Sequence, residues 1–312
     1  MRVAALVACA LVVTAQTALA CPCSDDAGSG LGLTRDDELA AAALVTSTRW
    51  ARGVFDAQGN YRPYESDESE TSQELLLRAA LRFPQRLEWL AELGYAAYRF
   101  HAGSLAHEQK GIGDLILRAR YLVLTEAMPH AALPLPSLGA TLLVRAPLGS
   151  ISAGAARGFG SGGPQLGLGA WEVGGGLDAA RAMTDALGLV LAGELGYRFE
   201  DHALGRPRQL GLRVEGLLGL RASPLDWLSG LVAVRARSSG DVEFGGRALA
   251  GTGERLVSLV LGGTIYDSRS GLRTSLTLSW DPPWSALSAG SSAQTALGVS
   301  IAKSVARLDP SE

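Results

Sequence analysis

Hydrophobic and polar residues alternate along much of the chain. The odd positions from Leu75 to Phe83 are apolar, whereas Glu74, Arg78 and Arg82 place charges on even positions. The same alternation recurs over residues 113–123, 187–200, 210–221 and 272–281. A period of two with one apolar face predicts β-strands, because successive side chains of a strand point to opposite faces of its sheet.

The length of these runs bears on the kind of sheet. They extend over about 10 to 14 residues, whereas strands of globular proteins average about 5–6 residues and tilted membrane strands need about 9–11. The charges in the middle of such strands must face water, and the polar lumen of a membrane barrel provides it. A secreted β-sandwich would show the same alternation, but the run length favours a transmembrane barrel.

The whole chain can be divided into twelve such strands. They lie near residues 39–53, 71–83, 87–100, 112–126, 138–149, 165–181, 185–200, 208–222, 225–238, 254–267, 270–281 and 293–306. The number is even, as is usual for single-chain bacterial barrels. We therefore predict an all-β fold, a transmembrane antiparallel up-and-down β-barrel of about 12 strands that occupies residues 39–308.

The connections between these strands alternate in length. Short connections are expected at 84–86, around 184, at 223–224 and at 267–269, with a medium one at 127–137. Longer polar or glycine-rich connections are expected at 54–70, 101–111, 150–164, 201–207, 239–253 and 282–292. Short turns on one rim and long loops on the other are typical of outer-membrane barrels.

The first twenty residues have the features of an export signal. A positive start precedes an apolar run over residues 3–13, and Ala18-Leu19-Ala20 has the small-x-small pattern of a cleavage site. The apolar run is too short to span a membrane as a helix, which needs about 20 residues. We expect residues 1–20 to be a removed signal peptide, residues 21–38 to form an N-terminal periplasmic segment, and the protein to reside in the bacterial outer membrane.

The mature chain would then begin at Cys21, with Cys23 two residues later. Three alternatives remain open for this pair: lipidation of Cys21, a local disulfide between Cys21 and Cys23, or two free thiols.

Composition excludes several other functions. Only 19% of the residues are charged and the net charge is −3, so we expect no nucleic-acid partner. The three cysteines and four histidines lack the spacing of a zinc site, and we predict neither a metal nor a cofactor. No histidine is set on a strand face beside an obvious nucleophilic serine, so we expect no enzyme; a lipid-modifying barrel enzyme is a remote alternative.

Three segments carry a resemblance to a known family. Cys21-Pro22-Cys23, the strand opening Gly111-Ile112-Gly113-Asp114 and the stretch from Leu143 to Gly149 resemble bacterial outer-membrane transporters of the MetA-pathway of phenol degradation family. The most specific parts cover about 40 residues. The resemblance implies a channel or transporter, and it is the sole basis for expecting apolar or aromatic solutes. The chain departs from the usual barrel end, because it continues past its last alternating strand without a terminal aromatic residue.

The charged residues of the expected inner face are the candidate functional residues. We propose that the pore is lined by Arg78, Arg82, Asp114, Arg118, Arg120, Glu194, Arg213, Glu215 and Arg273. Arginine has a fixed charge and a planar fork that suits carboxylate or phosphate groups. These residues would either filter solutes or form a salt-bridged interior that stabilises a closed barrel.

The expected function is that of a channel for small-molecule solutes, with no catalytic residues. Its partners would be outer-membrane lipid, the barrel assembly machinery and the solute. The alternative is a non-conducting structural or surface-binding barrel.

Overall fold

Each of the twelve alternating segments has a strand at its position in the computed structural model. The structure describes residues 38–83, 86–124, 136–149, 169–184, 186–203, 206–225, 227–283 and 288–307. The long strands are β1 (Glu38–Phe55), β3 (Glu68–Phe83), β4 (Leu87–Ala102), β5 (Leu105–Leu124), β6 (Ser137–Ala146), β7 (Glu172–Ala182), β8 (Leu187–Arg198), β11 (Arg213–Leu225), β12 (Leu228–Ser239), β15 (Glu254–Asp267), β16 (Leu272–Trp280) and β17 (Ser292–Arg307).

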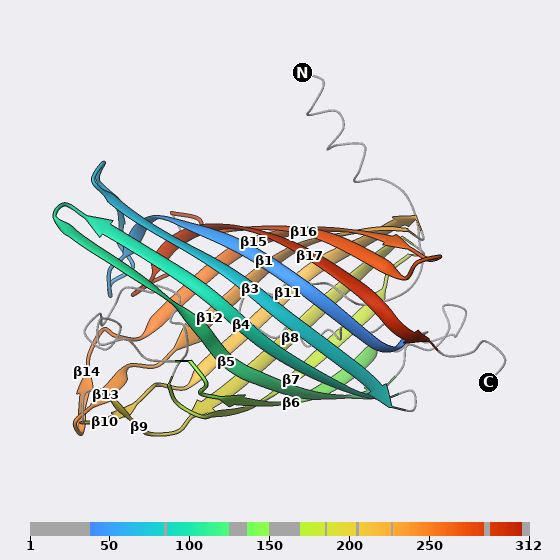
Figure 1. Ribbon diagram of the computed structural model, residues 1–312, viewed down its shortest axis with the longest axis horizontal. Coiled ribbons are helices and arrows are strands. Elements are labelled where there is room, and N and C mark those ends of the chain that lie inside the picture. The colour runs from blue at the N-terminus through green and yellow to red at the C-terminus, as the bar shows by residue number, and fades with distance from the viewer. Residues whose placement is uncertain are drawn as a thin grey trace, which may run out of the picture.

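These strands form one closed antiparallel barrel (Figure 1). Each long strand pairs with the next one along the chain, and β17 returns to pair with β1 from Glu38↔Arg307 to Val54↔Ser292. Closure pairs each long strand on both sides and so leaves no open edge in the described wall, as a lipid environment requires. The prediction of an all-β antiparallel barrel of twelve strands is confirmed.

The two faces of the wall differ as the alternation predicts. Large apolar side chains point outward and are exposed, and they include Leu77, Leu81, Leu142, Leu177, Leu191, Leu218, Val232, Leu261, Ile265, Leu276 and Ile301. The inward positions between them carry mostly small, polar and charged residues, with a few larger apolar ones such as Leu217 and Leu231. A soluble monomer rarely exposes a continuous apolar patch of more than a few hundred Å². The exterior is therefore suited to lipid, and the polar face lies on the inside.

A β-bulge interrupts this alternation in β5. The register moves from Leu93↔Leu115 to Tyr95↔Ile112, so that β5 has one more residue than β4 in this interval. Ile112 and Leu117 consequently both point outward, although one has an even and the other an odd number. The bulge thus allows the strand to extend beyond the charged band while its apolar residues stay on the outside.

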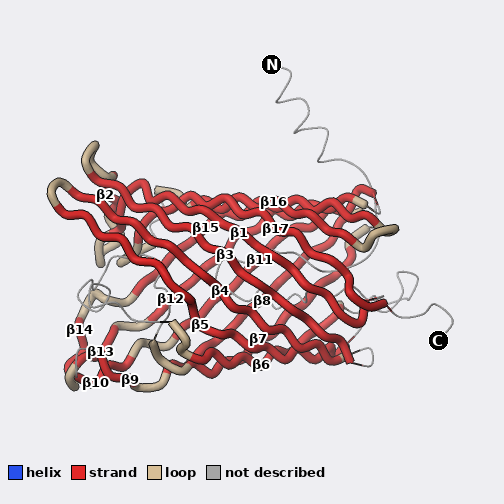
Figure 2. The backbone as a smooth tube through the Cα atoms, in the orientation of Figure 1, coloured by secondary structure: helices blue, strands red, loops and turns tan. Residues whose placement is uncertain are grey.

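The long-loop rim contains more strand than the sequence suggests. The predicted loop over residues 101–111 is wrong: β4 and β5 continue as a hairpin that turns at Gly103, whose φ is 57°. Polar residues occupy both faces of this extension, so it lacks the apolar alternation used to recognise strands. The hairpin projects beyond the barrel in the backbone view (Figure 2).

Five short strands also lie at this rim. The strand β2 (Tyr61–Pro63) pairs with the end of β1, and β9 (Asp201–Ala203), β10 (Arg206–Gln209), β13 (Val242–Phe244) and β14 (Arg247–Leu249) form a separate four-stranded sheet. This sheet joins two loops, 201–207 and 239–253, that are separated by 31 residues in the sequence.

Several predictions fall outside the described residues. The signal peptide over 1–20, Cys21, Cys23 and most of the segment 21–38 belong to this part, as do residues 165–168 of the sixth predicted strand and the whole connection 150–164. Within the described ranges, no helix is both long and apolar enough to cross a membrane.

Candidate functional site

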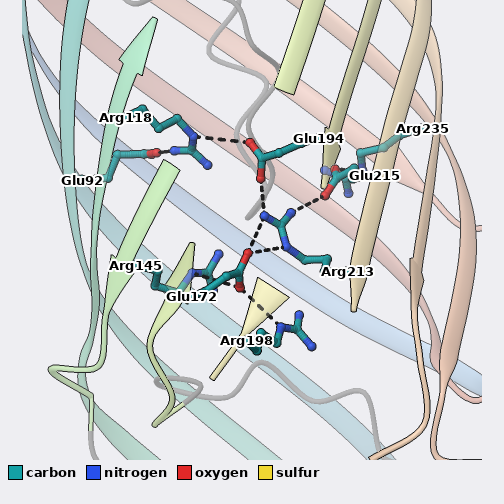
Figure 3. A network of polar contacts seen from close by, with 9 residues as sticks. All are labelled: Glu92, Arg118, Arg145, Glu172, Glu194, Arg198, Arg213, Glu215 and Arg235. Carbon is teal, nitrogen blue, oxygen red and sulfur yellow. Dashed lines mark hydrogen bonds and ion pairs between the residues drawn. The ribbon is translucent and has the colours of Figure 1, made fainter. Parts of the chain in front are cut away.

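A chain of ion pairs crosses the inner wall of the barrel (Figure 3). It begins on β3 and β4, where Arg78 Nη2 lies 2.5 Å from Glu92 Oε2. The other oxygen of Glu92 accepts a hydrogen bond from Arg118 on β5. Arg118 Nε in turn lies 3.7 Å from Glu194 Oε2 on β8. All four side chains are buried, so the pairs are screened little by solvent.

Arg213 on β11 is the centre of the second half of this chain. Its guanidinium contacts three carboxylates: it pairs with Glu194, lies 2.7 Å from Glu172 Oε1 through Nη2, and lies 3.3 Å from Glu215 Oε2 through Nη1. Glu215 Oε1 also lies 3.9 Å from Arg235 Nε on β12. Arg213 thus links β7, β8, β11 and β12 on the inside of the barrel.

Glu172 is shared by three arginines. Besides Arg213, its Oε2 atom lies 3.3 Å from Arg198 Nε and 3.9 Å from Arg145 Nε. Its side chain has no exposed area. The ion pairs named here between described residues join six guanidinium groups and four carboxylates, a formal excess of two positive charges within this set, and Arg78 and Arg235 have further partners.

Glycines provide the space for this network. Between Arg118 on β5 and Arg213 on β11, the register passes through Leu143, Gly174 and Gly196. Two of these three positions have no side chain, so the long charged side chains of the neighbouring positions can meet above the sheet.

Gly196 shows why this network requires a residue without a side chain. A Cβ atom at this position would lie 2.2 Å from Glu172 Oε1 and 3.3 Å from Arg213 Nη2. The carboxylate of Glu172 therefore occupies the place where any other residue at 196 would put its side chain.

Two further pairs lie nearer the short-turn rim. Arg120 forms a bidentate ion pair with Asp178, with Nε–Oδ1 and Nη2–Oδ2 distances of 3.0 and 2.6 Å. Arg273 Nη2 lies 2.9 Å from Glu38 Oε2, which connects the start of β16 to the start of β1. The parallel fork of Arg120 is the strongest ion-pair geometry available to these side chains.

The nine candidate residues from the sequence all lie on strands of the barrel, and eight of them are buried or take part in the ion pairs described above. Arg78, Arg118, Glu194, Arg213 and Glu215 join one network. Arg120 and Arg273 form separate pairs, Asp114 is buried, and Arg82 shares the inward face with Arg78. That they line a pore stays a prediction.

Seven partners in these ion pairs were not among the nine candidates. They are Glu38, Glu92, Arg145, Glu172, Asp178, Arg198 and Arg235. The alternation in the sequence could have identified two of them as inward-facing. Arg198 has the same parity as Glu194 in its strand, and Asp178 lies an even number of residues from the inward Gly174 and Gly176.

An apolar cluster occupies the inner wall towards the short-turn rim. It consists of Val190, Ala192, Leu217, Leu231, Ala233 and Val260, on β8, β11, β12 and β15. The first three of these strands carry Glu194, Arg213, Glu215 and Arg235 further along, so their inner wall changes from charged to apolar between the two rims.

A different polar cluster lies at the long-loop end of β3. Glu70 is buried and accepts hydrogen bonds from Tyr64 Oη at 2.6 Å and Ser292 Oγ at 2.9 Å. Burial and the charge of Glu70 raise the pKa of the Tyr64 hydroxyl far above its usual value, so Tyr64 remains a hydrogen-bond donor at all physiological pH values.

The described residues contain no arrangement with obvious catalytic or metal chemistry. Within the described ranges, none of the three histidines hydrogen-bonds to a serine; His101 Nδ1 lies 2.9 Å from the Asp67 carbonyl. No group of three or more His, Cys, Asp or Glu side chains in this part of the chain is placed to hold a metal ion.

Comparison with known proteins gives similarity at the level of the fold. No protein-family profile matches the sequence, and no curated protein matches it. The structure is similar to an outer-membrane channel from Pseudomonas putida F1, with a TM-score of 0.69 and 16% sequence identity, over 90% of this chain and 99% of that one. At this identity, the similarity shows a shared barrel fold.

Two other solved barrels match less well. The translocator domain of the autotransporter NalP from Neisseria meningitidis has a TM-score of 0.48 and 12% identity, over 89% of this chain and 90% of that one. The TodX deltaS2S3 mutant, a monoaromatic hydrocarbon channel, has a TM-score of 0.45 and 13% identity, over 87% and 91%.

Proposed function

We propose that this protein is a channel for small-molecule solutes in the bacterial outer membrane. The observation that carries the proposal is a closed twelve-stranded barrel with an apolar exterior and a charged interior, in a fold shared with an outer-membrane channel. Twelve strands enclose more space than the side chains of an eight-stranded barrel fill. The charged network then acts as the filter of the passage, and no covalent chemistry is involved.

The surroundings follow from the same proposal. Residues 1–20 serve as the export signal, the barrel assembly machinery inserts the mature chain, and outer-membrane lipid contacts the exterior. The short-turn rim faces the periplasm and the long-loop rim faces outward, as in other outer-membrane barrels. Apolar or aromatic solutes are supported by the family resemblance of the sequence, and the apolar cluster around Leu217 and Leu231 is compatible with them.

Reconstitution of residues 21–312 in planar bilayers tests the proposal. We expect discrete current steps, and a reversal potential in a KCl gradient that shows preference for anions because the network has excess positive charge. The variant Arg118→Ala removes one guanidinium and should reduce this preference. Arg120→Ala should reduce it as well, because it leaves the carboxylate of Asp178 without its partner.

The matched control is Arg99→Ala, since Arg99 is 75% exposed on the projecting hairpin. Its removal should leave selectivity unchanged. Unchanged ion selectivity in both variants, Arg118→Ala and Arg120→Ala, would show that these two residues do not line the passage.

The alternative is a non-conducting barrel that binds a partner at its surface. The separate four-stranded sheet at the long-loop rim favours it, because ordered loops present a fixed surface. Absence of current from protein shown to be folded and inserted would support this alternative and contradict the channel.

A further inference from the structure

Among the described residues, two arginines near the long-loop rim have fewer partners than their burial requires. The side chains of Arg145 and Arg198 are only 11% and 13% exposed. Both contact the carboxylate of Glu172, which Arg213 already holds at 2.7 and 2.9 Å. One carboxylate therefore serves three guanidinium groups, as the close-up view shows (Figure 3).

Counting the donors makes the shortage of acceptors clear. A guanidinium has five N–H groups. In the described part of the chain, Arg198 makes one hydrogen bond, at 3.3 Å to Glu172, and Arg145 makes none; its buried Nε lies 3.9 Å from the nearest Glu172 oxygen. By contrast Arg120, whose side chain is 15% exposed, uses two donors on Asp178.

The chemistry of such a site selects its ligand. Buried charged groups without acceptors are costly, so a ligand that supplies acceptor oxygens and negative charge is favoured there. At Glu172, among the described residues, one negative charge meets the positive charges of Arg145, Arg198 and Arg213. A carboxylate presents two coplanar oxygens at the spacing of the guanidinium fork.

The position suits a site that solutes reach first. Arg145 is the second-to-last residue of β6, Glu172 is the first residue of β7 and Arg198 is the last residue of β8. All three therefore lie where the barrel wall meets the long-loop rim. The apolar cluster that includes Ala192 and Val190 lies six to eight residues further along β8, about 20–26 Å from Arg198, so it forms a separate part of the inner wall.

We infer that Arg145 and Arg198 form a binding site for the carboxylate group of a solute. Glu172 holds the two guanidinium groups in place and leaves part of their donors for the ligand. The inference deepens the proposed channel function, on which it rests for its biological meaning.

Calorimetric titration of the full mature protein in detergent tests the site. Benzoate is the probe, and benzamide is its neutral counterpart of the same shape. We expect benzoate to bind and benzamide to bind at least about tenfold more weakly, because a hydrogen bond to a charged group contributes about 1.5–3 kcal/mol. Equal affinity for the two compounds would overturn the inference, as would binding of inorganic phosphate without binding of benzoate.

Variants then locate the binding. Arg198→Gln and Arg145→Gln should each lower benzoate affinity about tenfold or more, whereas Arg99→Gln on the exposed hairpin should leave it unchanged. Arg198→Lys keeps the charge and removes the fork, and so provides a readout if the glutamine variant does not fold. Unchanged affinity in both folded variants, Arg145→Gln and Arg198→Lys, would place the ligand elsewhere.

The binding measurement is independent of conduction, so the two proposals can fail separately. Benzoate binding by a protein that passes no current would support the carboxylate site and contradict the channel function. Current without benzoate binding would support the channel function and contradict the carboxylate site. Current steps interrupted by benzoate but not by benzamide would support both.

Discussion

Replacing Glu172 by glutamine should destabilise the barrel more than the loss of any exposed charge. The side chain of Glu172 has no exposed area and contacts Arg213, Arg198 and Arg145 at 2.7, 3.3 and 3.9 Å. Glutamine keeps the shape and one acceptor oxygen but removes the negative charge. Three buried guanidinium groups would then lack the carboxylate that they share.

The magnitude follows from these distances. At an effective dielectric constant of about 20, each of the three pairs attracts by about 4–6 kcal/mol. Much of this attraction offsets the cost of removing the charges from water. Breaking a buried pair by removing one partner costs about 3–5 kcal/mol, because the remaining charge stays buried. We therefore expect the free energy of unfolding to fall by about 3–5 kcal/mol.

Urea unfolding of the detergent-folded protein, followed by tryptophan fluorescence, measures this change. With a denaturant slope of about 3 kcal/mol/M, the midpoint should fall by about 1–2 M. The matched control is Glu108→Gln, whose partner Arg99 lies 3.4 Å away with both side chains largely exposed. Exposed pairs contribute about 0–1 kcal/mol, so the control midpoint should hardly move.

The two variants together decide the argument. If Glu172→Gln shifted the midpoint no more than Glu108→Gln does, the three-arginine contact would not be a buried, charge-dependent contact, and the acceptor shortage inferred at Arg145 and Arg198 would lose its basis. A large shift that benzoate partly reverses would support both the contact and the carboxylate site.

Three further perturbations have defined outcomes. Gly139→Ala would place a Cβ 2.4 Å from Asp178 Oδ1 and 2.9 Å from Arg120 Nε, so it should cost about 1–3 kcal/mol in urea unfolding, and an unchanged midpoint would contradict the packing described here. Leu177→Arg puts a charge on a residue 71% exposed on the outer face and should cost about 2–4 kcal/mol in lipid bilayers if this face contacts hydrocarbon; a negligible cost would argue against a lipid-facing wall. The pKa of Asp56 lies below its usual value because the side-chain and backbone amides of Asn60 donate hydrogen bonds to its carboxylate. The turn should therefore be stabilised above the ordinary aspartate pKa and lose this stabilisation as pH falls through the lowered value, which an NMR titration of the carboxyl group would show.

The charged interior gives the barrel a role for its many glycines that differs from bending. Gly139 and Gly196 each leave the space in which a carboxylate is held, as the contacts of an added Cβ show. Glycines within strands commonly mark bends of a closing sheet. The structure adds that these two inward glycines are needed for the ion pairs of Asp178 and Glu172.

The sequence by itself determined the number and order of the strands and which residues face inward. Alternation is a local property, because successive side chains of any strand point to opposite faces. Arg78, Arg118 and Arg213 could therefore be assigned to one face without knowledge of their neighbours. The projecting part of β4 and β5 was not predicted as strand, because polar residues lie on both of its faces and no alternation is present there.

Only the tertiary structure decided which charges meet. Arg118 reaches Glu194 across two intervening strands, and Glu172 lies among arginines from β6, β8 and β11. These contacts depend on the register of each strand pair, on a bulge in β5 and on the glycines at 174 and 196. Alternation is the same in every register that differs by two residues, so it fixes the face of a side chain but leaves its partner to the closed barrel.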